Sequence, residues 1–257
     1  MLNSNESPEI KSQEMSKFIY DRNDFRYKNL NDQELNSLEY RIAIGLDNRT
    51  YFQYYWSLLK KKQLILFAFL PNNDYNLGTI KIALFFLNFS LYFTINGFFF
   101  SDDSMHKVYE DNGQYHLYYR LPQIILSTLI PSIINMILRT LALSEKAIIE
   151  LKETIDLKNY LEKSKNIESC LKKKFISFFL LSFISMGFFW YFISCFCAVY
   201  INTQIILIED SIISFGLSMA YPFALNFIPG IFRIPALRAK NKDKECLYKI
   251  SAVIALI

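Results

Sequence analysis

The stretch FISFFLLSFISMGFFWYFISCFCAVYI (175–201) carries no charged side chain, and it decides the class of this protein. It exceeds the roughly 20 residues that a helix needs to cross a hydrocarbon core about 30 Å thick. Backbone amides cannot remain unpaired in lipid, and a helix pairs them internally. We therefore predict that this stretch is a transmembrane helix.

Three more stretches of this kind occur in the chain: GTIKIALFFLNFSLYFTINGFFF (78–100), LPQIILSTLIPSIINMILRTLAL (121–143) and SIISFGLSMAYPFALNFIPGIF (211–232). Lys81 and Arg139 are the only charged residues within the four stretches, and each lies near an end. All four are too long for the strands of about ten residues that build a membrane barrel. The sequence predicts an all-α membrane protein with four transmembrane helices.

The composition agrees with this class. Hydrophobic residues make up 52% of the 257 residues and gather in blocks instead of recurring with helix or strand period. The four cysteines have neither disulfide nor zinc spacing, which argues against a disulfide-stapled ectodomain. Residues 1–30 are polar and do not resemble a secretory signal, so we expect the first span to direct insertion.

The distribution of cations predicts the orientation. If both termini and the loop 144–174 share one side, every Lys and Arg except Lys107 and Arg120 lies on that side. Cations are retained on the cytosolic side of membrane proteins, so we expect both termini in the cytosol. The predicted organisation is a flexible polar tail (1–30), cytosolic and interfacial helices (31–76), a four-span bundle (77–235) and a basic cytosolic C-terminal segment (236–257).

The loop 144–174 alternates Lys and Glu over a helical pattern with Ile148, Leu151 and Ile155 on one side. We expect a helix that continues the second span into the cytosol. A solvated helix with opposite charges four residues apart is preferred over a coiled-coil docking site.

An N-terminal interfacial amphipathic helix is predicted before the first span. Asn31 begins one helical pattern, and Thr50 caps a second one that ends in three lysines. An aromatic stripe followed by a lysine cluster is typical of a helix lying against anionic lipid. The next apolar run, QLILFAFL (63–70), stops at Pro71 and is too short to span. The stripe comprises Phe52, Tyr55, Trp56 and Leu59, and the lysines are Lys60, Lys61 and Lys62.

Polar residues form stripes along spans one, two and four, whereas span three has none. We favour a bundle in which these faces hydrogen-bond to one another, because carboxylates are absent from the four stretches. A hydrated substrate path is the alternative. Proline residues should also kink or interrupt span four. The candidate intrabundle contacts are Asn88, Asn96, Ser132, Asn135 and Asn226.

Lys81 and Arg139 are expected to reach lipid headgroups together with Lys60, Lys61 and Lys62, although an anion-attracting mouth is an alternative. In the loop between the first two spans, His106, His116 and four carboxylates match no metal motif, and Asn112-Gly113 indicates a tight turn or hairpin. No hydrolase, transferase or phosphate-loop motif is present. We therefore expect no enzymatic activity, catalytic residue, cofactor or metal, and no binding of nucleic acid.

Several strings resemble a membrane module that is widespread in protist multi-pass proteins of unassigned function. They are DNRTYFQYYWSLLKKKQLILF (47–67), NDYN (73–76), FTINGFFFSDDSMHKVYEDNG (93–113), WYFISCFCAVYINTQIILIED (190–210) and YPFALNFIPGIFRIPALRAKNKDKECLYKISAVIALI (221–257). The resemblance covers about residues 30–257. It implies a bundle that often forms the C-terminal part of a larger surface protein, and it implies no activity, cofactor or catalytic residue.

The functional hypothesis is a membrane-anchoring or assembly module whose partners are the lipid bilayer, anionic lipid at the cytosolic face and other membrane subunits or further copies of the chain. The rival hypothesis is a channel or transporter subunit that uses the polar stripes as a pathway. The sequence does not indicate which membrane holds the protein.

Overall fold

A computed structural model describes residues 30–100, 102–110, 117–152, 154, 157–201, 203–239 and 244–255. All the regular secondary structure within these ranges is helical, so the all-α prediction is confirmed for them. Four helical segments are long and apolar enough to cross a membrane: Gly78–Phe98, Arg120–Ala142, Asn159–Val199 and Gln204–Arg238.

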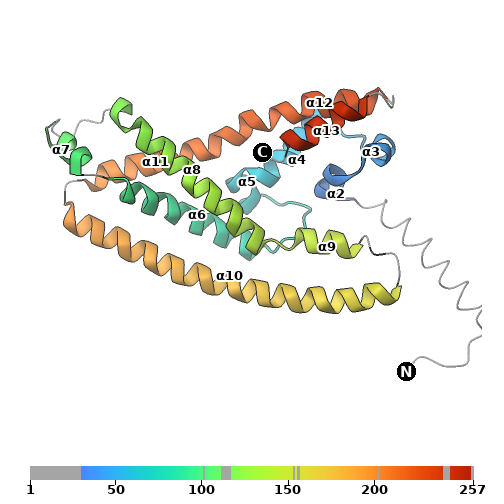
Figure 1. The fold of residues 1–257 in the computed structure, drawn as a ribbon, viewed down its shortest axis with the longest axis horizontal. Coiled ribbons are helices and arrows are strands. Elements are labelled where there is room, and N and C mark those ends of the chain that lie inside the picture. The colour runs from blue at the N-terminus through green and yellow to red at the C-terminus, as the bar shows by residue number, and fades with distance from the viewer. Residues whose placement is uncertain are drawn as a thin grey trace, which may run out of the picture.

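The long helices run side by side in alternating directions (Figure 1). They are α6 (Gly78–Phe98), α8 (Leu117–Ala142), α10 (Leu157–Val199), and α11 (Gln204–Leu225) followed by α12 (Phe227–Arg238). The first and last described segments, blue and red in Figure 1, lie in the same half of the molecule, which we call the near end. The opposite, far end carries α7 (Asp102–Glu110), where the sequence predicted a loop; the Asn112-Gly113 turn lies outside the described residues.

Short helices gather at the near end: α2 (Asp32–Ser37), α3 (Tyr40–Leu46), α4 (Tyr51–Lys62), α5 (Leu64–Phe69), α9 (Glu145–Lys152) and α13 (Glu245–Ile254). The N-terminal caps of α2 and α4 follow from local sequence. Asn31 and Glu34 form a capping box on α2, and Thr50 and Gln53 form one on α4. Both predicted helix starts are confirmed. The run 63–70 forms only α5, which is too short to span.

Span four is interrupted, as its prolines predicted. Helix α11 ends at Leu225, and α12 begins at Phe227 on the other side of Asn226. The backbone N–H and the side-chain amide of Asn226 both donate to the carbonyl of Pro222, at 3.0 and 2.7 Å. These bonds satisfy a carbonyl that the interrupted helix would otherwise leave unpaired.

The charged loop 144–174 does not continue the second span, so that expectation is wrong. Helix α8 ends at Ala142 and α9 begins anew at Glu145, while the segment from Leu157 is continuous with span three in α10. The break has a tertiary cause. The side-chain oxygen of Asn76 accepts the backbone N–H groups of Ser144 and Glu145 at 3.1 and 3.3 Å, which caps the new helix.

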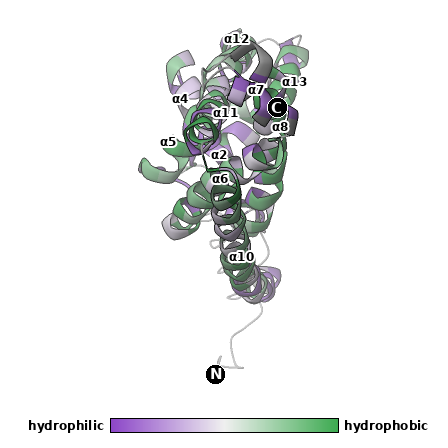
Figure 2. Cartoon of the chain, turned by 90° about the vertical axis from the view of Figure 1, so that its left-hand side faces the viewer, coloured by the Kyte–Doolittle hydropathy of each residue, from purple (hydrophilic) through white to green (hydrophobic). Residues whose placement is uncertain are grey.

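The four helical segments that are long and apolar enough to span differ in how deeply they are buried within the chain. In the most apolar part of α6, 50% of the residues are buried within the chain. In the most apolar part of α10, only 6% are buried. Helix α6 contacts α5, α8, α10 and α11. Figure 2 shows hydrophobic residues, in green, along the long helices viewed from the far end. The chain therefore has a central helix, α6, and a peripheral helix, α10.

Candidate functional site

The polar faces of spans one, two and four meet inside the bundle. Ser214 of α11 donates to the Asn96 side chain of α6 at 3.4 Å, and the hydroxyls of Tyr92 (α6) and Ser132 (α8) lie 3.3 Å apart. Thr128 of α8 donates to the Ser214 carbonyl at 3.5 Å. Two of the predicted contact residues thus make hydrogen bonds between helices: Asn96 accepts one from Ser214, and Ser132 shares one with Tyr92.

The other three predicted contact residues behave differently. The side-chain oxygens of Asn88, Asn135 and Asn226 are buried and have no hydrogen-bond partner among the described residues. Asn88 and Asn226 are almost fully enclosed. A buried amide oxygen without a partner is costly, typically about 1–3 kcal/mol, so these positions are candidates for bound water or for a partner outside the chain.

A charged pair lies inside the far end of the bundle. Asp210 of α11 is fully buried and is hydrogen-bonded to the guanidinium of Arg120 from α8, and the side-chain amide of Gln123 donates to the same carboxylate at 3.2 Å. The guanidinium also lies 5.0 Å from the ring of Phe100. The prediction that both residues lie outside the long helices is wrong, because α11 begins at Gln204 instead of Ser211 and α8 begins at Leu117 instead of Leu121.

The near end contains an extended ionic network. Arg233 of α12 is 1% exposed, and its Nη2 and Nε lie 2.9 and 3.2 Å from Oδ2 of Asp47. Its Nη2 also donates to the carbonyl of Leu35 at 2.7 Å, at the C-terminal end of α2. The rings of Tyr54 and Tyr248 flank the guanidinium at 5.0 and 4.6 Å. Arg233 thereby contacts four near-end segments, which are α2, the C-terminal cap of α3, α4 and α13.

Arg49 completes this network from the other side of Asp47. Its Nε lies 2.8 Å from Oδ1 of Asp47, and its Nη2 bonds to the side chain of Asn36 at 2.8 Å. Burial alone would raise the pKa of Asp47, but the hydrogen bonds and charges of Arg49 and Arg233 outweigh burial and lower the pKa below its ordinary value. The Arg49–Asp47–Arg233 network therefore keeps the carboxylate ionised.

The cations predicted to reach lipid headgroups occupy distinct environments at this end. Lys81 is buried and paired with Asp74, and Arg139 donates to the carbonyls of Lys61 and Lys62 at the C-terminus of α4. The Arg139 guanidinium also lies 4.4 Å from the Phe67 ring. Contact of these residues with headgroups stays a prediction, but the structure supplies a protein partner for each.

The three consecutive lysines also differ from one another. Lys60 lies 3.4 Å from Asp32, and Lys61 donates to Gln33, whereas the side-chain ammonium of Lys62 has no hydrogen bond or ion pair within the described ranges. Burial lowers the pKa of Lys62 to about 8, and the nearby charges of Lys61 and Arg139 act in the same direction. Burial likewise lowers the pKa of Lys61, although Glu145 opposes the shift.

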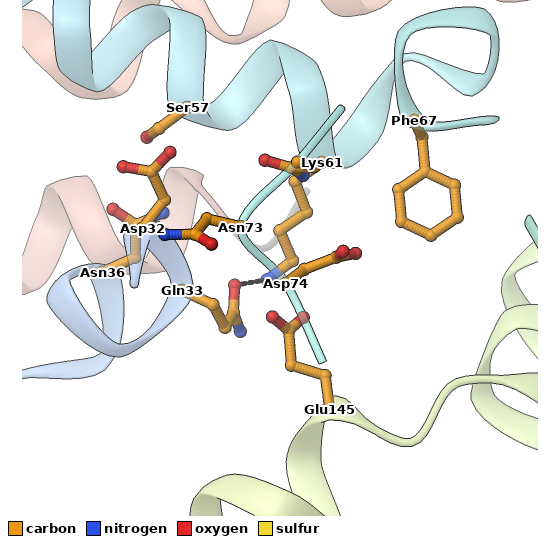
Figure 3. Close-up of a pocket in the computed structure, with 10 residues that line it drawn as sticks. Asp32, Gln33, Asn36, Ser57, Lys61, Phe67, Asn73, Asp74 and Glu145 are labelled. Carbon is orange, nitrogen blue, oxygen red and sulfur yellow. Dashed lines mark hydrogen bonds between the residues drawn. The ribbon is translucent and has the colours of Figure 1, made fainter. Parts of the chain in front are cut away.

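A small cavity of about 20 Å³ lies beside Lys61. Figure 3 shows the Lys61 side chain extending from α4 toward Gln33, with the carboxylates of Asp74 and Glu145 nearby. One carboxylate oxygen of Glu145 is buried without a partner among the described residues, and burial raises the pKa of this group. The space suffices for about one water molecule. A second hollow of about 250 Å³ lies beside Asp47 and Arg49, between α3 and α12.

No sequence pattern predicted Asp47, Arg49, Glu145 or the internal role of Arg233 as part of the site. Arg233 is the only charged residue in the apolar run from Phe227 to Leu237, and a lone charge in such a run is a usable signal for a buried partner. Its partner Asp47 lies far away in sequence, where nothing local marks it. Among the described residues, no group of His, Cys, Asp or Glu could hold a metal ion.

The near-end arrangement binds helices together and concentrates positive charge. Two arginines of spanning helices, Arg139 and Arg233, donate to carbonyls at the C-terminal ends of α4 and α2. These bonds attach the short helices to the bundle. No family of known proteins matches the chain, and neither a characterised protein nor a solved structure matches it.

Proposed function

We propose that this chain is a membrane-anchoring or assembly module without enzymatic activity. In this proposal, four helices cross the bilayer, both termini face the cytosol, and the near end contacts anionic lipid. The spans bind one another on one side and leave an apolar surface for lipid, partner subunits or further copies of the chain on the other.

The observation that carries the proposal is the outer surface of α10. The helix is highly apolar, yet only 6% of the residues in its most apolar part are buried within the chain. Large side chains face outward along its length, including Ile176, Phe183 and Tyr191. Exposed apolar surface of this extent requires lipid or protein to cover it.

The exposed side of α4 supports an interfacial position for this helix. Phe52 and Trp56 are 74% and 46% exposed, while the opposite face, with Tyr54 and Leu58, packs against the bundle. Exposed aromatic residues beside lysines are typical of helices that lie at the headgroup level.

Cysteine labelling tests the orientation. Cys170 of α10 and Cys246 of α13 are exposed at the near end, and Glu110 is exposed on α7 at the far end. An impermeant maleimide should label the two native cysteines only after cells are permeabilised, and should label a Glu110→Cys variant in intact cells. Labelling of Cys170 in intact cells would reverse the proposed topology.

A photo-crosslinking amino acid tests the assembly role. Placed at Phe183 on the outer face of α10, it should capture a partner subunit or a second copy in native membranes. The matched control is Leu84 of α6, which is fully buried and should give no intermolecular product. If Phe183 yields only lipid adducts, the assembly role is wrong and anchoring alone remains.

A channel or transporter subunit is the second candidate. It is favoured by the buried side-chain oxygens of Asn88 and Asn135, which have no partner among the described residues and could line a hydrated path. The purified chain, reconstituted into liposomes, would then give an ion flux that changes in Asn88→Leu or Asn135→Leu. A well-folded preparation without flux would contradict this candidate.

A further inference from the structure

Five cations were predicted to contact lipid headgroups, and the structure separates them. Lys60, Lys61, Lys81 and Arg139 each have a protein partner. The side-chain ammonium of Lys62 has none within the described ranges, although the residue is half-buried. A partly buried ammonium without a counter-ion is unfavourable, so this position is suited to an external anion.

The surroundings of the Lys62 side chain are positively charged. The charges of Lys61 and Arg139 act on the Lys62 ammonium, whereas the carboxylate of Glu145 acts on Lys61. Arg139 has five N–H donors and uses two in bonds to the carbonyls of Lys61 and Lys62. An anion at Lys62 could therefore receive further hydrogen bonds from the same guanidinium.

We propose that Lys62 and Arg139 form a binding site for the phosphate of an anionic membrane lipid. A guanidinium and an ammonium together provide planar and point-charge donors that suit a phosphate. Arg139 lies in the last turn of α8, a helix long and apolar enough to cross a membrane, so we expect it close to the headgroup level. Ile65 and Phe69 of α5 are exposed just beyond Lys62 and offer apolar surface for acyl chains. This inference rests on the proposed anchoring function and identifies its lipid partner.

The test uses the full chain purified in a neutral detergent. Binding of phosphatidylserine is measured as the rise in thermal unfolding temperature when mixed micelles of phosphatidylcholine receive increasing phosphatidylserine. Lys62→Gln should weaken the apparent affinity about fivefold, the factor that one lysine near an anionic surface supplies. Lys60→Gln is the matched control, because Lys60 is already paired with Asp32, and it should leave the affinity nearly unchanged. Lys62→Arg should retain binding.

The controls separate the possible outcomes. Equal losses in Lys60→Gln and Lys62→Gln would show a diffuse charge effect and overturn the site. An equal response of the wild type to inorganic phosphate without phosphatidylserine would assign the site to free phosphate and overturn the lipid proposal. Unchanged affinity in Lys62→Gln would also overturn it, while the anchoring function would stand if the chain remains in alkali-washed membranes. A chain that is soluble without detergent would contradict both.

Discussion

Helices α6 and α10 are both long and apolar enough to cross a membrane, yet α6 lies inside the bundle and α10 lies at its edge. Helix α6 carries a polar stripe and packs against four other helices, whereas α10 carries none and exposes most of its apolar residues. In lipid, apolar surface alone does not drive two helices together, because the lipid is equally apolar. Polar and small residues therefore decide which helix is central. We call α6 and the helices around it the packed region, which comprises α3, α4, α6, α8, α11 and α12.

The largest effect should come from the buried ionic network of the packed region. Asp47→Ala leaves Arg233 buried without its carboxylate, and loss of one partner from a buried pair typically costs about 3–5 kcal/mol. The counterpart on α10 is Glu168, which pairs with Lys172 on an exposed surface. Glu168→Ala should leave stability unchanged, because exposed pairs contribute little. Reversible unfolding in mixed micelles measures both; equal losses would contradict the comparison.

The same carboxylate should make the packed region sensitive to acid. The pKa of Asp47 is lower in the folded protein than its ordinary value of 3.8, so its stabilising contribution is complete above that value. The contribution should be lost as the pH falls from 3.8 through the lower pKa of the folded state. Unfolding measured from pH 6 to pH 2 should show this loss in the wild type and a smaller one in Asp47→Asn, in which the group no longer titrates. Parallel curves would exclude Asp47 as the source.

A pair of apolar truncations compares the two helices directly. Leu84 of α6 is fully buried, and its replacement by Ala should cost about 2–5 kcal/mol through lost contacts and a cavity. Phe183 of α10 is 80% exposed, and its replacement should change the unfolding free energy by about 0.5 kcal/mol or less. If Phe183→Ala destabilises the isolated chain as much as Leu84→Ala does, α10 is not peripheral.

Much of this contrast was predictable from sequence. The four helices and the break in span four follow from apolar length and from proline positions. The sequence did not predict that residues 157–174 continue span three, because their alternating charges suit a continuation of either neighbouring span. The cap that separates α8 from α9 comes from Asn76, which lies far away in sequence. Asp47 and Arg233 are likewise joined only by the fold. Local patterns predicted elements, whereas long-range polar contacts decided how they are connected.

Two glycines probe how closely α10 approaches the packed region. A Cβ atom on Gly97 of α6 would lie 3.0 Å from the ring of Phe192 in α10, whereas one on Gly187 of α10 would meet nothing within 4 Å. Gly97→Leu should destabilise by about 1–3 kcal/mol, because the larger side chain forces the two helices apart. Gly187→Leu is the matched control and should be neutral or slightly stabilising, since leucine favours the helix. A neutral Gly97→Leu would mean that α10 adjusts freely to α6.

The smallest effect should come from single hydrogen bonds between spans. Ser214→Ala removes a bond from α11 to Asn96 of α6, and such bonds average about 0.6 kcal/mol in membrane bundles. Ser194 of α10 donates only to Trp190 of its own helix among the described residues, so Ser194→Ala should have no measurable effect. A double-mutant cycle of Ser214→Ala with Asn96→Ala isolates the interspan bond from other consequences of each change. A coupling energy of zero would mean that the polar stripe marks the packed face without stabilising it, and that tight packing of small side chains holds α6 in the centre.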